Sequence, residues 1–209
     1  MTEEQTSVAV VWSPHVRAQC PSFLYWVGGK SAFTPLVMPC VHRRLLATGG
    51  TYVDPFLGGG AFPLDLGLGT RAEPRMRLSD INRPLVITYL AVRDRWQAIA
   101  DALATLAEDT SEARFLAIRD AYNAILRPLR ELPQPRSWLE DDELAIYFLY
   151  LNALAHSGLY RVNKSGDFNA PYGHNCILSA FKRMALGEAL SAASAALQGA
   201  TLAVADFES

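Results

Sequence analysis

A chain of 209 residues, half of them hydrophobic and 19% charged, is large enough for one globular domain with a sizeable core. Its formal net charge of −2 is not that of a strongly basic nucleic-acid-binding protein, and its acidic, polar start excludes a secretory signal peptide. No apolar run reaches the roughly 18 residues that span a membrane. Three scattered cysteines, without a CxxC pair, predict a cytoplasmic protein and no metal site.

Helices and short strands alternate in the first part of the chain. After a loose leader over residues 1–20, apolar spacing predicts a helix over 31–46. A short apolar strand over 51–56 ends in three glycines, a helix over 61–68 follows, and a second strand covers 76–79. Strand, glycine turn, helix and strand in this order predict an α/β domain.

Long helices dominate the rest of the chain. The predicted helices, rich in apolar residues, span 84–107, 111–126, 141–154 and 181–197. A loop with two prolines is expected over 129–136, a Gly- and Asn-rich loop over 156–175, and a last strand over 201–205. The helices between 84 and 200 predict a mainly helical insertion within the α/β domain.

The glycine turn over residues 54–60 joins the first strand to a helix. Glycines let the backbone turn sharply and approach a ligand closely, and the helix N-terminus beyond them offers free N–H groups. Asp80 lies 20 residues past Gly60, where an acid can accept both ribose hydroxyls of an adenosine-containing cofactor. The spacing does not fit the GxGxxG of dinucleotide sites. A plain tight turn with a helix-capping aspartate explains the same residues equally well.

The Gly- and Asn-rich loop lies within residues 150–185, where bases outnumber acids, so a DNA-binding surface is expected there if anywhere. Arg161 has the planar donor fork that matches guanine O6 and N7. Asn163 and Lys164 are suited to holding phosphates. The loop is either a β-hairpin that enters a DNA groove or a structured surface loop with a salt-bridged arginine, and the residues alone favour the second.

Five motifs in a fixed order resemble those of Dam-type DNA adenine-N6 methyltransferases (class alpha). They are Trp26-Val-Gly-Gly-Lys30 for WxGGK, Asp54-Pro-Phe-Leu-Gly-Gly-Gly60 for (D/E)PFxGxG, Leu78-Ser-Asp80-Ile-Asn82 for (N/A)D(I/F)N, residues 158–173 for GLxRxNxxxxFNVPxG, and Asp206-Phe207-Glu208 for (G)DFE. The resemblance runs from about residue 22 to 209. The long hairpin motif is highly specific and the others are moderately so.

The resemblance implies a partial Rossmann-like S-adenosylmethionine-dependent methyltransferase core over 21–83 and 199–209. A mainly helical target-recognition insertion carrying a β-hairpin would occupy 84–198. The cofactor-binding residues would be Trp26, Lys30, Asp54, Phe56, Gly58, Gly60, Asp80, Asp206 and Phe207. Asp80 would hold the ribose, and Asp206 and Phe207 would lie at the adenine of S-adenosylmethionine. By their own chemistry, Trp26 is more often a core aromatic residue and Lys30 a solvated charge.

The same resemblance makes the loop a DNA-reading β-hairpin and makes double-stranded DNA a partner. The DNA-binding residues would be Ser157, Leu159, Arg161, Asn163, Lys164 and Pro171, with Leu159 and Pro171 suited to a thymine methyl group. Ser157 stands where the family usually has Asn, and His156 stands where it usually has an aromatic residue. GATC is the default target that the resemblance suggests.

The family's catalytic element is a [D/N/S]PP[Y/F/W] motif, which binds the amine of a flipped-out adenine and stacks on its base. This sequence has no Pro-Pro, and its single Asp-Pro belongs to the glycine turn. We therefore assign no catalytic residue. Three hypotheses fit: half of a split methyltransferase whose partner polypeptide carries the motif, a truncated fragment, or a non-catalytic DNA- and cofactor-binding protein on the same scaffold.

The resemblance also predicts an open sheet edge. It places the strand at 51–56 in the middle of the family's sheet, with those at 76–79 and 201–205 on one side and the remaining strands after residue 209. The strand at 51–56 would then expose unpaired N–H and C=O groups beside apolar side chains. We expect the chain alone to self-associate and to form a 1:1 complex with a second polypeptide.

Overall fold

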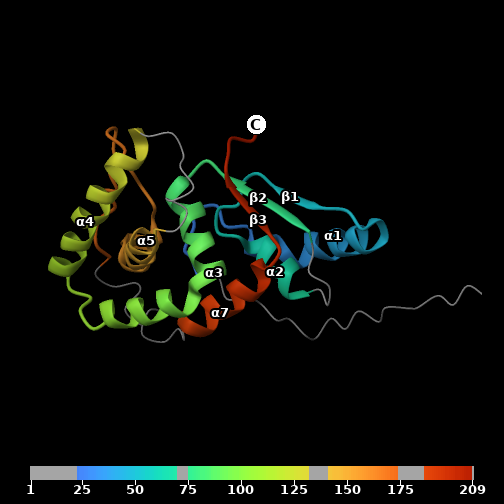
Figure 1. Cartoon of the computed structure of the whole chain (residues 1–209), viewed down its shortest axis with the longest axis horizontal. Coiled ribbons are helices and arrows are strands. Elements are labelled where there is room, and N and C mark those ends of the chain that lie inside the picture. Colours follow the sequence, from blue (N-terminus) through green and yellow to red (C-terminus); the bar gives the residue numbers. More distant parts are fainter. Residues whose placement is uncertain (1–22, 70–74, 132–140, 174–185, 209) are drawn as a thin grey trace, which may run out of the picture.

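A computed structural model of the chain describes residues 23–69, 75–131, 141–173 and 186–208 (Figure 1). The predicted leader, the beginning of the helix expected over 181–197, and the basic residues Lys182 and Arg183 lie outside the described residues. The described part is an α/β structure with three parallel strands and six α-helices, which agrees with a partial methyltransferase fold. None of its helices combines the length and the apolar character needed to cross a membrane.

The sheet consists of β1 (Tyr52–Asp54), β2 (Met76–Asp80) and β3 (Thr201–Val204), in the order β1-β2-β3. The central strand β2 pairs in parallel with both neighbours. The three strands fall where the sequence predicted them, although β1 is shorter than expected. Among the described residues β1 pairs on one side only, so the expected edge position of this strand is confirmed.

The two faces of the sheet differ in burial. One face, with Met76, Leu78 and Leu202, is buried in the core, where α3 (Arg83–Leu106) packs against β2 and β3. The alternate residues are exposed on the opposite face; they are Val53, Arg77, Thr201 and Ala203. Parallel sheets are usually covered on both faces. Within the described part of the chain, this sheet therefore has one uncovered face of mixed polarity.

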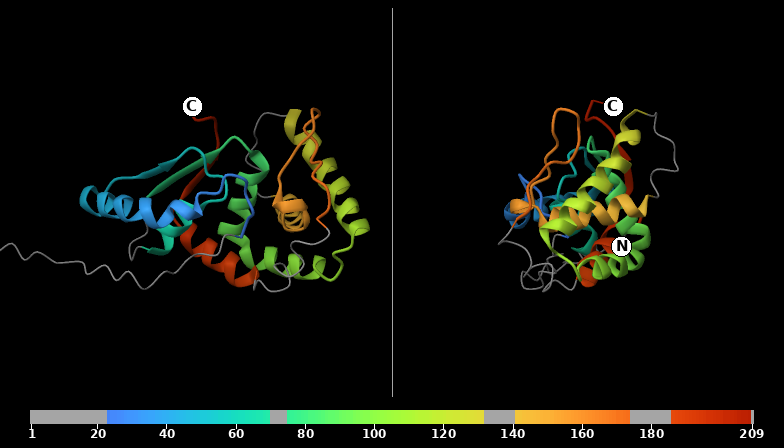
Figure 2. Two further views of the ribbon diagram at one scale, coloured as in Figure 1. Left: turned by 180° about the vertical axis from the view of Figure 1, so that it is seen from behind. Right: turned by 90° about the vertical axis from the view of Figure 1, so that its left-hand side faces the viewer.

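Helices connect the sheet to a second, mainly helical part. The helix α1 (Thr34–Thr48), preceded by the short 3-10 turn η1 (Ser31–Phe33), packs against α2 (Ala61–Gly69). The helix α7 (Leu186–Leu197) packs against both α2 and α3. On the side of α3 away from the sheet lie the two helices of the second part (Figures 1 and 2).

These two helices are α4 (Glu112–Glu131) and α5 (Asp142–Leu154). The helix α3 is buried along much of its length because the sheet and α7 pack on it from one side and α5 from the other. It bends at Arg95, whose φ of −141° and ψ of 31° are not helical. This bent helix thus lies between the sheet and the helical part and packs against both.

Two features differ from the sequence prediction. A loop was expected from residue 129, but α4 continues through Pro128 to Glu131. A proline inside a helix removes the backbone hydrogen bond to the carbonyl four residues earlier, here that of Ala124. The Arg83 guanidinium donates to the Leu129 carbonyl, one of the last-turn carbonyls that an α-helix leaves without a helical partner. The predicted hairpin folds back with only two isolated antiparallel bridges, Val162 with Phe168 and Ala155 with Tyr172, and not with two regular strands.

Candidate functional site

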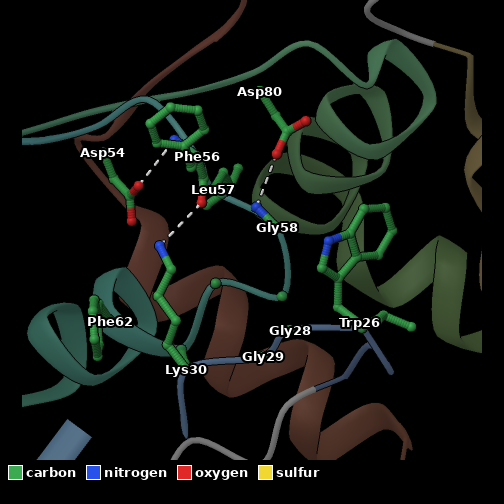
Figure 3. Close-up of a pocket in the computed structure, with 14 residues that line it drawn as sticks. Trp26, Gly28, Gly29, Lys30, Asp54, Phe56, Leu57, Gly58, Phe62 and Asp80 are labelled. Carbon is green, nitrogen blue, oxygen red and sulfur yellow. Dashed lines mark hydrogen bonds between the residues drawn. The ribbon is translucent and has the colours of Figure 1, made fainter. Parts of the chain in front are cut away.

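A cavity of about 230 Å³ opens at the carboxyl ends of β1 and β2 (Figure 3). Residues 26–30 and 56–62, together with Asp54 and Asp80, line it. The cavity therefore brings together the predicted cofactor residues Trp26, Lys30, Asp54, Phe56, Gly58, Gly60 and Asp80. In open α/β sheets, ligands bind in such crevices outside the carboxyl ends of the strands.

The glycine loop is shaped mainly by its own backbone. Gly58 and Gly60 have φ values of 47° and 69°, in the left-handed region that favours glycine. The Gly60 N–H donates to the Leu57 carbonyl at 2.9 Å, and the Tyr89 hydroxyl donates to the Gly58 carbonyl at 3.1 Å. A Cβ atom at Gly60 would overlap that hydroxyl. The loop thus requires glycine at this position because of both its conformation and its packing on α3.

Asp80 joins the glycine loop to the end of β2. Its Oδ2 accepts a hydrogen bond from the Gly58 N–H and its Oδ1 one from the Asn82 N–H, both at 2.9 Å. Each carboxylate oxygen can accept a second donor, which leaves capacity for hydroxyl groups. The helix cap of α3 is Asn82, whose side chain accepts from the Leu85 N–H at 3.1 Å. The alternative that Asp80 is only a helix cap is therefore wrong.

Asp54 and Lys30 form the other wall of the cavity. The buried Asp54 carboxylate accepts hydrogen bonds from the Phe56 N–H at 3.0 Å and from the Tyr52 hydroxyl at 3.2 Å. Burial, and then the charge of Asp54, raises the pKa of Tyr52 well above its usual value. Lys30 Nζ lies 3.5 Å from the Phe56 carbonyl oxygen, so its ammonium group points into the cavity (Figure 3).

Trp26 is both a cavity wall and a packed aromatic residue. Cβ atoms built on Gly58 and Gly59 would lie 3.0 and 3.1 Å from its side chain, so the glycine loop runs directly against the indole. The indole also stacks on Tyr160, with ring centroids 5.7 Å apart, and on Phe148, at 6.4 Å. Trp26 can therefore be a packed aromatic residue and still line a cavity that could hold a cofactor.

Asp206 and Phe207 follow β3 and do not line the cavity itself. The Phe207 ring lies 5.5 Å from that of Phe56, and the two residues are 61% and 57% exposed. The Ala205 N–H donates to the Asp80 carbonyl, which ties the end of β3 to the end of β2. Two exposed phenyl rings thus stand together at the rim of the cavity.

The predicted DNA-reading segment leaves α5, passes through the 3-10 turn η3 (His156–Gly158) and folds back on itself. Five of the six predicted DNA-binding residues are exposed, and Leu159 is half-buried; the exposed ones are Ser157, Arg161, Asn163, Lys164 and Pro171. Ser157 adopts a φ of 55°, which is unusual for a residue with a side chain.

Arg161 hydrogen-bonds along the hairpin. Its Nε donates to Asn169 Oδ1 at 2.9 Å and its second guanidinium nitrogen donates to the Asn169 carbonyl at 2.8 Å. Asn169 is neutral, so these contacts do not make the salt-bridged arginine that the surface-loop alternative assumed. The Asn163 Oδ1 accepts from the Asp167 N–H at 2.9 Å, so this side chain closes the turn at the tip.

Two buried asparagines that the sequence analysis missed hold the hairpin from below. Asn123 of α4 binds both backbone groups of Phe168, at 2.8 and 3.1 Å. Asn152 of α5 accepts from the Tyr25 N–H at 2.9 Å and donates to the carbonyls of Tyr25 and Gly158. Each of these asparagines interrupts an apolar helical pattern in the sequence, and this was the signal that could have revealed a buried amide. Asn152 thus connects the segment before Trp26 to the beginning of the hairpin.

Two arginines of α4 hold the hairpin tip. Arg127 and Arg130 pair with Asp167 at 3.0 and 3.1 Å, and Arg130 also donates to the carbonyls of Ser165 and Gly166. The hydrogen bond from Arg127 holds the pKa of Asp167 below its usual range, and Arg130 acts in the same direction. Two cations face one anion here. The basic surface therefore includes α4, outside residues 150–185, where the sequence analysis had placed it.

Comparison with known proteins gives a consistent match over most of the chain. Residues 26–209 match the family described as D12 class N6 adenine-specific DNA methyltransferase. Over 154 residues, or 73% of the chain, the sequence is 32% identical to the DNA adenine methylase of Serratia marcescens and 31% identical to that of Escherichia coli, covering 48% and 47% of these proteins. It is 28% identical to the type II methyltransferase M.MjaIII of Methanocaldococcus jannaschii over 72% of the chain and 51% of that protein. The chain thus spans about half the length of the curated relatives it matches.

Proposed function

Because the chain belongs to the D12 class of N6-adenine-specific DNA methyltransferases, we propose that it provides the cofactor site and the DNA-reading segment of a site-specific enzyme. That enzyme transfers a methyl group from S-adenosylmethionine to adenine N6 in duplex DNA. The observation that carries the proposal is one cavity in which the WxGGK segment, the glycine loop and Asp80 meet.

The residues around the cavity fit S-adenosylmethionine. Asp80 retains acceptor capacity for ribose hydroxyls while it holds the Gly58 N–H. The exposed rings of Phe56 and Phe207 offer apolar faces to an adenine. The cofactor, when bound, supplies an electrophilic methyl group. In this proposal Trp26, Lys30 and the glycine loop enclose it, and the carboxylate and the aromatic rings orient it.

The hairpin is proposed to read the DNA. Arg161 has guanidinium donors directed along an exposed loop, and rotation away from Asn169 would free its fork for a guanine edge. Lys164, at the exposed tip, would contact phosphates. Ser157, Leu159, Asn163 and Pro171 complete the proposed surface. The fixed anchoring of this loop on α4 and α5 is what a reading element requires, since a mobile loop would lose entropy on binding.

We place the catalytic [D/N/S]PP[Y/F/W] motif in a second portion of the enzyme, on the same or a separate polypeptide. Two surfaces of the chain suit such a portion. The edge strand β1 and the uncovered sheet face have unused backbone groups and exposed side chains. On α1, Leu36 and its neighbours Phe33 and Val37 are 74%, 58% and 38% exposed. The alternative is a non-catalytic DNA- and cofactor-binding protein on the same scaffold.

The test compares the purified chain with a co-expressed pair. The second polypeptide is the segment that carries the motif, encoded next to this chain or taken from the unmatched part of a relative. We expect the chain alone to bind S-adenosylmethionine weakly in calorimetry, to self-associate in light scattering and to transfer no tritiated methyl group to an adenine-containing duplex. The pair should be a 1:1 complex that methylates DNA.

The outcomes separate the hypotheses. Methyl transfer by the chain alone would overturn the division of the enzyme into two portions. A monodisperse, cooperatively unfolding monomer that binds both ligands, and stays inactive when the second polypeptide is added, would favour the non-catalytic binding protein. A chain that binds no S-adenosylmethionine in either form would contradict the proposed cofactor site.

A further inference from the structure

The residue before Arg161 joins the cofactor cavity to the DNA-reading hairpin. The Tyr160 ring stacks on Trp26, at 5.7 Å between centroids with the planes 23° apart. It also packs against Phe148 at 5.3 Å and Phe168 at 5.6 Å. A residue of the hairpin therefore packs directly against Trp26, which lines the cavity.

The hydroxyl of Tyr160 points to α4. It lies 3.4 Å from the Tyr122 hydroxyl, and either group can be the donor. The ring and the hydroxyl of one side chain thus contact the Trp26 wall of the cavity and the helix that anchors the hairpin.

We propose that Tyr160 is a positioning residue that couples occupancy of the cofactor cavity to the arrangement of Arg161. The proposal rests on the proposed function, since it requires that the cavity binds S-adenosylmethionine and that the hairpin binds DNA. A ligand that contacts Trp26 restricts the ring on which Tyr160 stacks. Arg161 is the next residue, so the backbone that carries its side chain is restricted as well.

The coupling is reciprocal by thermodynamic necessity. If the cofactor raises the affinity for DNA by some factor, DNA raises the affinity for the cofactor by the same factor. Tyr160 need not touch either ligand for this to hold. The side chain only has to stabilise the arrangement of Trp26 and Arg161 that both ligands bind. Tyr160 can do so because it stacks on Trp26 and directly precedes Arg161.

The experiment measures DNA binding by fluorescence anisotropy with and without S-adenosylhomocysteine, a cofactor product that cannot donate a methyl group. The duplex contains GATC, and a pool of randomised duplexes replaces it if GATC is not bound. The chain is used alone or in its 1:1 complex, whichever is monodisperse. We expect the nucleoside to raise the affinity of the parent for DNA at least about fivefold.

Three variants separate coupling from simple packing. Tyr160→Leu removes the stack and the hydroxyl, and should bring the coupling factor close to one. Tyr160→Phe keeps the stack and should retain much of the factor. The matched control is Tyr172→Leu, another half-buried tyrosine of the hairpin, which packs on Phe115 and donates to the Thr110 carbonyl. The control should keep the full factor, because a general loss of stability lowers the affinity equally with and without the nucleoside.

Hydrogen exchange in the parent keeps the proposal testable if Tyr160→Leu does not fold. Saturating S-adenosylhomocysteine should slow the exchange of amides over residues 159–169, and Tyr160→Phe, which keeps the stack, should retain much of this protection. Unchanged exchange over these residues in the parent would contradict the proposal. Binding of both ligands without any coupling in the parent, or equal factors in the parent and Tyr160→Leu, would overturn the role of Tyr160. Failure to bind the nucleoside at all would instead overturn the proposed function.

Discussion

The cavity and the hairpin are both built from loops, but different groups hold them. Backbone hydrogen bonds and the carboxylates of Asp54 and Asp80 shape the glycine loop, next to an edge strand and an uncovered sheet face. Buried amides and an ion-pair cluster shape the hairpin, and all of them come from α4, α5 or the hairpin itself. The contacts that hold the hairpin therefore lie within the helical part of the described residues, whereas the cavity lies beside the open edge of the sheet.

The largest effect is expected from Asn152, whose buried amide binds both the segment before Trp26 and the beginning of the hairpin. Asn152→Leu leaves the backbone groups of Tyr25 and the Gly158 carbonyl without a partner. Each unsatisfied buried group costs about 1–3 kcal/mol, so we expect the free energy of unfolding in urea to fall by roughly 3 kcal/mol. S-adenosylmethionine binding should weaken as well, because Tyr25 precedes Trp26.

The matched variant is Asn123→Leu, which removes an equally buried amide that binds only the hairpin. It should destabilise the protein by about 2 kcal/mol and leave the affinity for S-adenosylmethionine unchanged. Equal losses of cofactor affinity in the two variants would show that the cavity and the hairpin are not separate units, and would remove the basis of the comparison.

Asp80→Ala tests the cavity alone. The substitution removes a charged acceptor of the proposed ribose hydroxyls and also the partner of the Gly58 N–H. We expect S-adenosylmethionine binding in calorimetry to weaken by about 1.5–3 kcal/mol, the usual contribution of charged hydrogen bonds. The control is Asp101→Ala, at an exposed position of α3. If both variants bind the cofactor as the parent does, the acid after β2 only shapes the loop.

Two basic residues test the hairpin alone. If the planar fork of Arg161 reads a guanine edge as proposed, Arg161→Ala should cost about 1–3 kcal/mol of DNA affinity and relax the preference at one base position. Lys164→Ala should weaken binding evenly across sequences and reduce the dependence on salt. Anisotropy titrations against duplexes that differ at single base pairs measure both. An Arg161→Ala variant with unchanged affinity for every duplex would restore the surface-loop interpretation.

Much of the fold could be predicted from the sequence because it depends on local patterns. Apolar spacing located the helices and the short strands within a few residues, and the motifs located the cavity that Trp26, Lys30 and Asp80 share. The continuation of α4 past Pro128 was not predicted, because the prolines in this part of the sequence indicated a loop. The last turn of the helix buries Leu129 and receives a hydrogen bond from Arg83, 46 residues away, and neither contact can be read from the local sequence.

The contacts of the hairpin were also beyond the sequence. The charge count over 150–185 missed Arg127 and Arg130, because charges from two distant segments become neighbours only in the folded chain. In the same way, the stack of Tyr160 on Trp26 joins residues that are far apart in sequence. The sequence therefore predicted which loop each residue belongs to. Which side chains hold these loops in place depends on tertiary packing, which the local sequence does not show.

The smallest effect concerns strain at the beginning of the hairpin. Ser157 has a φ of 55° and a ψ of 24°, in the left-handed region, which costs an ordinary residue about 1–2 kcal/mol. Asparagine tolerates this region better than serine. We therefore expect Ser157→Asn to raise the free energy of unfolding by less than about 1 kcal/mol.

The control for this change is Ser165→Asn, at an exposed position of the same hairpin whose φ is not positive. It should leave the midpoint of urea unfolding unchanged, because no strain is relieved there. A stabilised Ser157→Asn variant with unchanged S-adenosylmethionine affinity would mean that the hairpin carries local strain that its anchors on α4 and α5 support without help from the cavity. A variant that is no more stable than the parent would show that this turn holds serine without cost. The contrast between the two regions would then depend on the buried amides alone.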